Sequence, residues 1–287
     1  MPTIPSLSLV IPAYNESARL GDTLRQVFDY FNAQSTLAEV IVVDDGSGDD
    51  TSRVAEASFA RHAGATAARV IRVEPNRGKG HAVRTGLLAA RASVALFSDA
   101  DLSTPITETP KVTGPIRSGQ YDLIFGSRAL DRTLIGVHQP WRREQGGRFF
   151  NLVVRLATGM PFWDTQCGFK AFRMDVCRPI IEAATIDRFG FDVELLYVAR
   201  LANLRLREWP VRWDHNEGGK VEYTRDSLRM LNEVRLIRAQ AQRGVYERAL
   251  NEARALRAQL GNNSPVLDEG MLPPPSDVSP ELAKSRY

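Results

Sequence analysis

Two aspartates separated by one residue, Asp99 and Asp101, follow an apolar run that ends at Phe97. In extended backbone, residues two apart point to the same side, so the two carboxylates would lie close together. Like charges held close repel each other unless a cation or a proton intervenes. A divalent cation bound by carboxylates and substrate phosphates relieves that repulsion and neutralises charge on a departing diphosphate. Asp99 and Asp101 therefore form a predicted site for Mg²⁺ or Mn²⁺, with Asp101 a predicted catalytic residue.

Polar turns also follow the first two apolar runs of the chain, at Pro12–Glu16 and Asp44–Thr51. Carboxylates at the carboxyl end of a strand, before a glycine-rich turn into a helix, can accept hydrogen bonds from a ribose or a base edge. Asp, Gly and Ser are also the usual residues of turns that cap helices. The residue types alone leave both interpretations of Asp44–Thr51 open.

A third polar segment, Asn76–Gly86, places glycines on both sides of Lys79. Val83 stands where the third glycine of the dinucleotide fingerprint should be, and the segment lacks P-loop spacing. The segment therefore disfavours a Rossmann dehydrogenase and a Walker-type ATPase. Glycines beside a lysine at the start of a helix still suit the close approach of a nucleotide.

The elements that must position these residues follow a simple rhythm of short apolar runs and helix-period segments. The predicted strands are Leu7–Ile11, Val40–Val43, Arg69–Val73, Val94–Phe97 and Leu123–Phe125. Helical patterns cover about 17–34, 50–62 and 80–90 between them. This alternation predicts an α/β fold with a mostly parallel sheet flanked by helices, whose ligands bind beyond the carboxyl ends of the strands.

The second half of the chain is more helical and divides by composition. We expect a catalytic domain at 1–222, with a donor side at 1–130 and an acceptor side at 131–222. Residues 223–260 carry an amphipathic pattern that predicts one long or two shorter helices, and 261–287 form a predicted disordered tail. The arginines of 223–260 could dock on anionic lipid, or they could form a solvated face.

Composition excludes several classes of protein. A net charge of +3 is too small to indicate nucleic-acid binding, and two cysteines make no disulfide framework. The N-terminus lacks a signal-peptide pattern, and no window approaches the ~20 apolar residues of a membrane span. The sequence therefore predicts a cytoplasmic protein whose membrane contact is peripheral, at the inner face. It leaves the oligomeric state open.

Taken together, the motifs resemble those of glycosyltransferase family 2, whose catalytic domain has the GT-A fold. The motifs that carry this resemblance are Pro12–Glu16, Val43–Ser47, Asn76–Gly80, Ser98–Pro105 and Phe125–Arg128. Two later motifs, Asp164–Lys170 and Phe191–Leu196, resemble the dolichyl-phosphate β-glucosyltransferases and their bacterial polyprenyl-phosphate relatives. The resemblance runs from about Leu7 to Val221.

This resemblance implies a nucleotide-sugar donor, most simply UDP-glucose, and a polyprenyl phosphate acceptor. The implied donor-binding residues are Pro12, Tyr14, Glu16, Asp44, Asp45, Lys79 and Asp99. The implied acceptor-phosphate residues are Arg128, Arg142, Arg143, Arg148 and Lys220. The chain departs from the family pattern at Glu217–Lys220, where relatives often have Gly-Ser-Lys, and at Gly146–Gly147, where some relatives have a serine.

An acceptor phosphate is already anionic near neutral pH, so the protein must mainly align it and stabilise charge. Attack opposite the departing nucleotide would invert the anomeric centre, with Asp101, Asp192 and Arg128 as the predicted catalytic residues. If the acceptor is a soluble hydroxyl, Asp192 or Glu194 becomes the candidate general base. A GDP-mannose-dependent mannosyltransferase, a sugar nucleotidyltransferase and a non-catalytic binding module are further alternatives.

Overall fold

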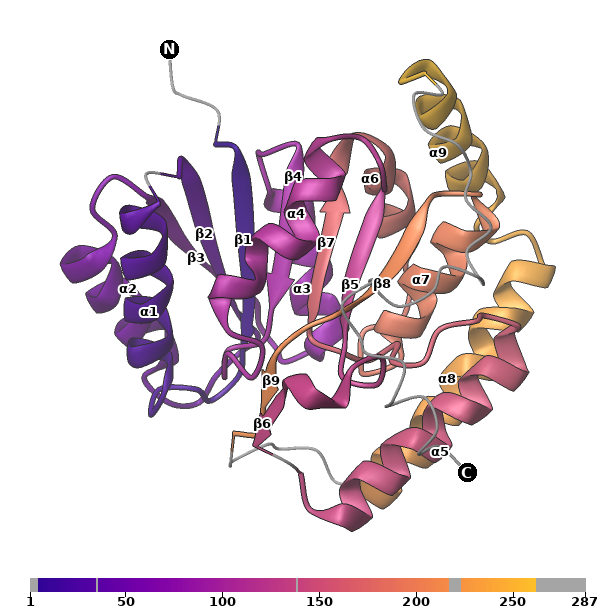
Figure 1. Ribbon diagram of the computed structural model, residues 1–287, viewed down its shortest axis with the longest axis horizontal. Helices are drawn as coiled ribbons and strands as arrows, with labels where there is room; N and C mark the ends of the chain where they lie inside the picture. Colours follow the sequence, from indigo (N-terminus) through magenta and orange to yellow (C-terminus); the bar gives the residue numbers. More distant parts are fainter. Residues whose placement is uncertain (1–4, 35, 138, 217–222, 262–287) are drawn as a thin grey trace.

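The computed structural model describes residues 5–34, 36–137, 139–216 and 223–261, without the side chains of 141–144 and 223–228. A seven-stranded sheet runs through this part of the chain, with helices on both faces (Figure 1). Its strands are β1 (Leu7–Ala13), β2 (Ala38–Asp44), β3 (Ala67–Arg72), β4 (Val94–Ser98), β5 (Leu123–Ser127), β7 (Phe169–Arg173) and β8 (Leu206–Pro210). The predicted α/β class is confirmed.

The strand order is β3-β2-β1-β4-β7-β5-β8, and every pairing is parallel except those of β7. β7 runs antiparallel between β4 and β5. It is absent from the runs that the sequence predicts as strands, because Lys170 interrupts its apolar residues. β1 and β2 are buried along their whole length, as expected for central parallel strands covered on both faces.

Nine helices of the described residues cover the two faces of the sheet. They are α1 (Leu20–Ala33), α2 (Thr51–His62), α3 (Lys79–Ala89), α4 (Thr109–Arg117), α5 (Trp141–Thr158), α6 (Met174–Ala183), α7 (Phe191–Leu201), α8 (Tyr223–Gln242) and α9 (Glu247–Gln259). Helices α1, α2 and α4 pack over one face, and α3, α6 and α7 over the other. A small parallel pair, β6 (Ile135–Val137) and β9 (Trp213–Asp214), lies outside the main sheet.

The C-terminal region forms two helices, which is one of the two arrangements that its amphipathic pattern allows. Val234 and Ile237 of α8, Ala253 of α9 and the intervening Tyr246 are buried in the same core as α3, α6 and α7. The apolar faces of both helices therefore contribute to the main fold. Across the described residues, no helix combines the length and the apolar character that crossing a bilayer requires.

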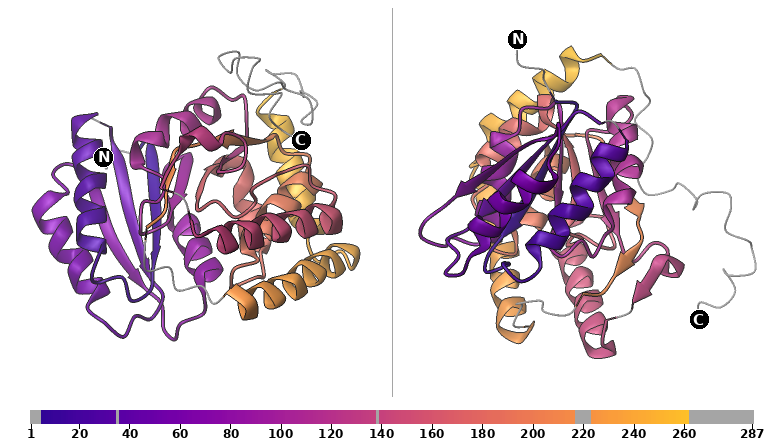
Figure 2. Two further views of the ribbon diagram at one scale, coloured as in Figure 1. Left: turned by 60° about the horizontal axis from the view of Figure 1, so that its bottom comes forward. Right: turned by 90° about the vertical axis from the view of Figure 1, so that its left-hand side faces the viewer.

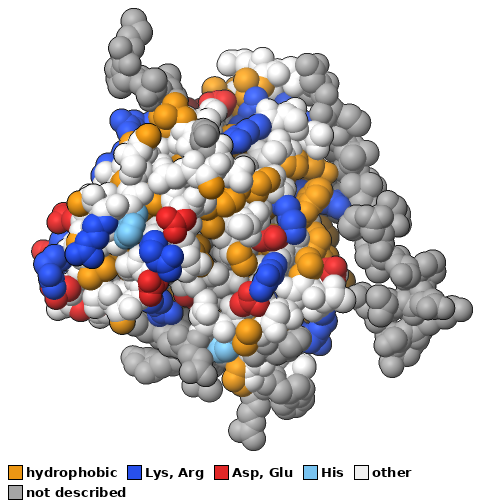
Figure 3. All heavy atoms as spheres, turned by 60° about the vertical axis from the view of Figure 1, so that its left-hand side comes forward, with side chains coloured by type: hydrophobic (Ala, Val, Ile, Leu, Met, Phe, Trp, Pro, Cys, Tyr) orange, Lys and Arg blue, Asp and Glu red, His pale blue; other side chains and the backbone are white. Residues whose placement is uncertain are grey.

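Charges on the molecular surface are mixed. On the face shown in Figure 3, which brings the left-hand side of Figure 1 forward, basic and acidic side chains are interspersed. This arrangement agrees with the net charge of +3, and it gives that face no field of a single sign.

Candidate functional site

A pocket of about 350 Å³ lies beyond the carboxyl ends of β1, β2 and β4. β1 stands between β2 and β4, so the strand order changes direction here, and open α/β sheets bind their ligands at such a switch point. The pocket is lined by Pro12, Ala13, Tyr14, Glu16, Arg19, Asp45, Asn76, Gly78, Lys79, Ala82, Asp99, Ala100, Asp101, Arg188 and Phe189. All three polar segments of the sequence thus meet in one place.

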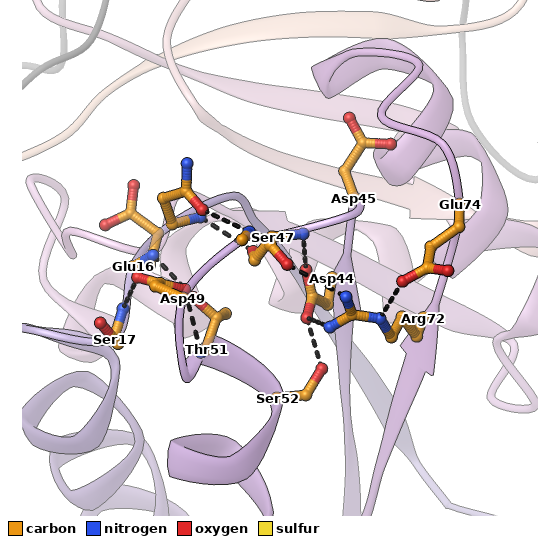
Figure 4. Close-up of polar contacts among 12 residues, drawn as sticks. Glu16, Ser17, Asp44, Asp45, Ser47, Asp49, Thr51, Ser52, Arg72 and Glu74 are labelled. Carbon is orange, nitrogen blue, oxygen red and sulfur yellow. Dashed lines mark hydrogen bonds and ion pairs between the residues drawn. The ribbon is translucent and has the colours of Figure 1, made fainter.

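The loops after β1 and β2 hold each other in position (Figure 4). The backbone N–H of Asn15 donates to Oγ of Ser47 (2.9 Å), and the N–H of Gly48 donates to Oδ1 of Asn15 (2.8 Å). The N–H of Glu16 donates to Oγ1 of Thr51 (2.8 Å). These bonds fix the mouth of the pocket, because they tie Glu16 and its neighbours to the start of α2.

Asp44 and Asp45 point in different directions (Figure 4). The Asp44 carboxylate accepts hydrogen bonds from the N–H of Ser47 (2.8 Å), from the hydroxyl of Ser52 and from the guanidinium of Arg72 (3.0 Å). Burial raises the pKa of Asp44, but these bonds outweigh burial and hold it below its usual value. Asp44 is absent from the pocket lining, so the structure places it in support of the loop, away from the predicted donor contact.

Asp45 lines the pocket and anchors the loop before α3. Its carboxylate accepts hydrogen bonds from Nδ2 of Asn76 (2.8 Å) and from the backbone N–H groups of Arg77 (3.1 Å) and Gly78 (2.7 Å). Three donors on one buried carboxylate leave it few orientations. Asp45 therefore sets the course of the chain into Lys79.

Lys79 and Asp99 form an ion pair in the pocket, with 2.6 Å between Nζ and Oδ1. Gly78, before Lys79, has a φ of +118°, and a Cβ there would meet the carbonyl oxygen of Asp187 at 2.5 Å. Only glycine fits that conformation and that space. Burial lowers the pKa of Lys79, but the carboxylates of Asp99 and Asp192 outweigh burial, so its pKa lies above the usual value.

The backbone of Asp99 is hydrogen-bonded to the residue before β7, the strand that the sequence did not predict. Its backbone N–H donates to the carbonyl oxygen of Gly168 (3.0 Å), the residue before β7. A Cβ on Gly168 would lie 2.0 Å from Oδ2 of Asp99. The carboxylate of Asp99 therefore occupies space that any other residue at position 168 would fill.

Asp101 lies in a tight turn beyond β4. Its Oδ1 accepts a hydrogen bond from the N–H of Ser103 (2.9 Å), and its carbonyl oxygen accepts one from Nδ2 of Asn216 (2.6 Å). Between Asp101 and Ser103, Leu102 has a φ of +46°. A branched side chain rarely adopts this left-handed conformation, and such strain concentrates at functional sites.

The donor atoms of Asp99 and Asp101 suit a divalent cation. Oδ1 of Asp99 is buried and is held by an ion pair, without a regular hydrogen bond. The described residues contain no group of three or more metal-binding His, Cys, Asp or Glu side chains. A cation here would therefore take two carboxylates and complete its shell with water and phosphate oxygens, which is the set that Mg²⁺ favours.

Asp192 and Glu194 lie on the same helix but do different things. Oδ1 of Asp192 lies 2.6 Å from Nζ of Lys170, which is 0% exposed and also donates to the carbonyl oxygen of Cys167 (2.6 Å). Burial raises the pKa of Asp192, against the lowering effect of Lys170 and Lys79. Asp192 is absent from the pocket lining. Its charge therefore acts on Lys79 from the interior of the protein, behind the pocket wall.

Glu194 connects the core to the C-terminal helices. Its carboxylate accepts hydrogen bonds from the N–H groups of Thr185 (2.9 Å) and Ile186 (2.8 Å) and from the hydroxyl of Tyr246 (2.7 Å). These contacts position the loop before α7, whose Arg188 and Phe189 line the pocket. The hydrogen bonds of Glu194 thus hold structural elements together, and Glu194 is absent from the pocket lining.

A second, smaller pocket of about 100 Å³ carries three arginines. Arg128, Arg132 and Arg148 line it, and Arg128 is already held by Asp164. Nε and Nη2 of Arg128 each lie 2.7 Å from a different oxygen of that carboxylate. Burial would lower the pKa of Arg128, but Asp164 outweighs burial and raises it, with a further contribution from Asp99.

A buried glutamate supports this second pocket. Glu208 of β8 accepts hydrogen bonds from the N–H groups of Trp163 (2.8 Å) and Asp164 (2.8 Å) and from Oγ of Ser127 (2.6 Å). Burial raises the pKa of Glu208 to about 7 despite these donors. Glu208 thereby positions Asp164, and through it Arg128.

The structure brings together most of the residues that the sequence predicted. Pro12, Tyr14, Glu16, Asp45, Lys79, Asp99 and Asp101 line the first pocket, and Arg128 and Arg148 line the second. Lys220 and the side chains of Arg142 and Arg143 lie outside the described residues. Sequence reasoning included Asn76 only as part of the segment Asn76–Gly86. It missed Arg188 and Phe189 in the first pocket and Arg132 in the second, because their positions depend on loop conformation.

Comparison with known proteins assigns the family. Residues 8–180 match the model for glycosyl transferase family 2, which is more than half of the chain. The chain belongs to glycosyltransferase family 2. The resemblance carried by its motifs is confirmed, and the chain is a glycosyltransferase.

This family 2 glycosyltransferase is similar to named relatives along most of its length. It is 37% identical over 226 residues to the dolichyl-phosphate β-glucosyltransferase of Drosophila melanogaster. This alignment covers 75% of this chain and 69% of the relative. It is 33% identical over 251 residues to the enzyme of that name from Homo sapiens, covering 84% and 77%. Both alignments thus cover more of this chain than residues 8–180.

A solved structure shows the same fold. Glucosyl-3-phosphoglycerate synthase from Mycobacterium tuberculosis, in complex with Mn²⁺ and UDP-glucose, aligns with a TM-score of 0.54 and 22% identity. The alignment covers 81% of this chain and 77% of that chain. The similarity identifies the architecture as GT-A-like, as the motifs predicted.

Proposed function

We propose that this family 2 glycosyltransferase transfers glucose from UDP-glucose to a polyprenyl phosphate, with inversion at the anomeric carbon. The observation that carries the proposal is the pairing of two pockets. One is lined by carboxylates and Lys79, and the other by three arginines, and segment 164–168 contacts both, through Gly168 to Asp99 and through Asp164 to Arg128. An anionic donor and an anionic acceptor each have a place in this arrangement. The names of the relatives at 33–37% identity support glucose and a lipid phosphate as the substrates.

The first pocket suits the nucleotide sugar. Tyr14 presents a partly exposed ring at its mouth, on which a flat base can stack, and Asp45 keeps Asn76 and Gly78 in place beside it. Lys79 stands at the start of α3, where its charge and the N-terminal end of the helix both favour the diphosphate. These groups bind and orient the donor before any bond changes.

Asp99 and Asp101 would hold the divalent cation. Bound there, it supplies positive charge to the diphosphate as the sugar leaves. Among this chain's own residues, Lys79 adds positive charge beside Asp99, and the Asp192 carboxylate favours the charged form of Lys79. A preorganised group of this kind stabilises charge that develops in the transition state without having to reorganise.

The second pocket suits the acceptor phosphate. An oxygen of that phosphate attacks the anomeric carbon, and the bond from this carbon to the UDP oxygen breaks with its electron pair going to UDP. A phosphate monoester needs no strong base, so the arginines must mainly bring two anions together. Arg128 is fixed by Asp164, and Arg132 and Arg148 line the same pocket. Guanidinium groups bind phosphate through directed, charge-assisted hydrogen bonds.

A transfer assay tests the proposal. Purified protein would be incubated with radiolabelled UDP-glucose, a polyprenyl phosphate in detergent and Mg²⁺ or Mn²⁺, and label would be counted in the organic phase. We expect acid-labile lipid-linked glucose that depends on protein, acceptor and metal. GDP-mannose in place of UDP-glucose is the matched donor control, and a dephosphorylated polyprenol is the matched acceptor control.

Two results would contradict the proposal. Equal transfer to the polyprenol would show that the arginine pocket does not select a phosphate. Efficient glucose transfer to a soluble hydroxyl acceptor, with no label in the lipid, would assign the chain to a different acceptor class within the same family.

A further inference from the structure

Helix α5 exposes an apolar face that the main fold leaves uncovered. Phe149, Leu152 and Leu156 are 66%, 48% and 78% exposed, although their neighbours Phe150 and Val154 are buried in the core. The three exposed residues follow the i, i+3, i+7 spacing of one helix face. Large apolar side chains gathered on a surface in this way mark a site of interaction.

Trp163 extends this face from the neighbouring loop. Its side chain is 55% exposed, and the guanidinium carbon of Arg155 lies 3.8 Å from the centre of its ring. Such a cation–π contact fixes the ring beside the helix. We call Phe149, Leu152, Leu156 and Trp163 the α5 face.

The α5 face continues into the arginine pocket. Gly147, Arg148 and Asn151 of α5 line that pocket, as does Trp163. At about 100° per residue, Arg148 and Arg155 lie on the helix between the pocket side and the apolar side. Along α5, these guanidinium groups therefore lie between the exposed apolar side chains of the helix and the arginine pocket. Lipid headgroups lie between acyl chains and water in the same way.

The charge of α5 favours an anionic partner. Its eighteen residues contain four arginines and one glutamate. Helix α8 lies beside α5, as Figure 2 shows at left, and exposes Arg229, Arg235 and Arg238. An amphipathic helix with arginines on its polar side and Trp, Phe and Leu on its apolar side is suited to the surface of a bilayer.

We propose that the α5 face inserts into the surface of an anionic bilayer, so that the arginine pocket opens at the depth of the lipid headgroups. This inference rests on the proposed function, since it explains how a phosphate attached to a long apolar chain reaches the pocket without leaving the membrane. It assigns membrane docking to α5 and Trp163, whereas the sequence pattern had pointed to the arginines of 223–260.

Vesicle flotation tests the docking surface apart from catalysis. The full chain would be mixed with vesicles of phosphatidylcholine alone or of equimolar phosphatidylcholine and phosphatidylglycerol. We expect binding to the anionic vesicles that weakens with salt. The double variant Leu152→Gln/Leu156→Gln should bind roughly tenfold more weakly, because it removes two apolar side chains from the lipid. Glutamine keeps the helix, and neither leucine lines a pocket.

The matched control is the double variant Leu37→Gln/Leu260→Gln, whose leucines are 43% and 41% exposed and lie outside α5. It should bind vesicles as the wild type does. Both double variants should glucosylate a short, water-soluble prenyl phosphate at the wild-type rate, and only the α5 variant should lose activity on long-chain acceptor in vesicles. Brominated phosphatidylcholine should quench the fluorescence of the wild type more than that of Trp163→Phe.

Three results would overturn the docking surface. The first is equal vesicle binding by the wild type and the α5 variant. The second is equal loss in the control variant. The third is a difference in sedimentation coefficient between the wild type and the α5 variant when both bind vesicles equally. That result would make the α5 face a contact between copies of the chain. If vesicle binding depends on α5 but no lipid-linked glucose forms, docking stands and the proposed acceptor fails.

Discussion

Asp99 and Asp101 are one residue apart, but their surroundings differ. Asp99 is paired with Lys79 and packed on Gly168, whereas Asp101 accepts a backbone hydrogen bond in a strained turn. Little of the folded structure therefore depends on the charge of Asp101, and we propose that this charge acts mainly when the diphosphate departs.

We predict that Asp101→Asn lowers kcat by about a hundredfold or more while leaving the melting temperature close to that of the wild type. The measurement is steady-state glucose transfer at saturating donor, acceptor and metal. Asp175→Asn, an exposed position on α6, is the matched control. Wild-type turnover by Asp101→Asn would remove this carboxylate from the mechanism.

Gly168 offers a test of Asp99 that leaves its charge intact. A methyl group at position 168 must displace the Asp99 carboxylate, because the two would be 2.0 Å apart. We predict that Gly168→Ala weakens metal-dependent binding of UDP-glucose by roughly tenfold, on the basis that ligand groups must be held closely to their productive geometry. Isothermal titration with and without Mg²⁺ would measure this. Gly114→Ala, where a Cβ meets nothing within 4 Å, should bind normally.

The arginine pocket makes a prediction about acceptor binding. Arg128→Ala would leave the buried Asp164 carboxylate without its partner, so any loss would mix folding with function. Arg148→Gln avoids this problem, because Arg148 is an exposed side chain at the edge of the pocket. We predict a KM for lipid phosphate at least about tenfold higher, with UDP-glucose affinity unchanged. Equal weakening of donor and acceptor would place Arg148 with the donor.

The individual residues of the site were predictable in type but less so in direction. The sequence marked Asp44 and Asp45 as a pair, and also Asp192 and Glu194. In the structure, one member of each pair supports a loop, and the other acts on the pocket or on Lys79. Neighbours in a turn and residues two apart on a helix point to different sides, so a shared motif does not imply a shared role.

At the scale of elements, the parallel strands were predictable and the antiparallel one was not. β1 and β2 are mostly apolar runs, whereas β7 has Lys170 as the second of its five residues. That lysine can be fully buried because the Asp192 carboxylate balances its charge and the carbonyl oxygen of Cys167 accepts a hydrogen bond from it. Such pairing across elements overrides local patterning, and no feature of the short segment itself reveals it.

The hydroxyl of Tyr246 makes one of the contacts between α7 and the C-terminal helices. Tyr246 donates to the buried carboxylate of Glu194, which also holds the loop before α7. We predict that Tyr246→Phe lowers the free energy of unfolding by about 1–3 kcal/mol, because Glu194 loses a buried partner. Urea denaturation would measure the loss, with Tyr30→Phe on α1 as the matched control. An unchanged midpoint would show that this bond contributes little to stability.

Across the whole molecule, the sequence predicted the class of fold and the edge of the sheet where the site lies. It could not predict how α8 and α9 pack, because an amphipathic pattern identifies an apolar face without naming what covers it. The structure covers those faces with the catalytic core, so removing both helices would also remove Val234, Ile237 and Tyr246 from it. The exposed apolar face of α5 is a separate feature. It is recognised from the exposed fractions of its side chains, and the sequence pattern alone does not reveal it.

The two halves of the donor pocket come from distant parts of the chain, and this leads to a prediction about the folded state as a whole. Asp187 pairs with Arg77 (2.8 Å) and Arg84 (2.6 Å), so the loop that carries Arg188 is tied to the loop that carries Lys79. A donor bound between these loops stabilises the native state only, by an amount set by its concentration and affinity.

At about a hundred times its dissociation constant, UDP-glucose with Mg²⁺ should raise the melting temperature by about 5 °C or more. GDP-mannose with Mg²⁺ should raise it less, and UDP-glucose with EDTA should lose most of the shift. A larger shift with GDP-mannose would assign the pocket to a different nucleotide, and a shift that EDTA leaves intact would show that donor binding does not need the cation.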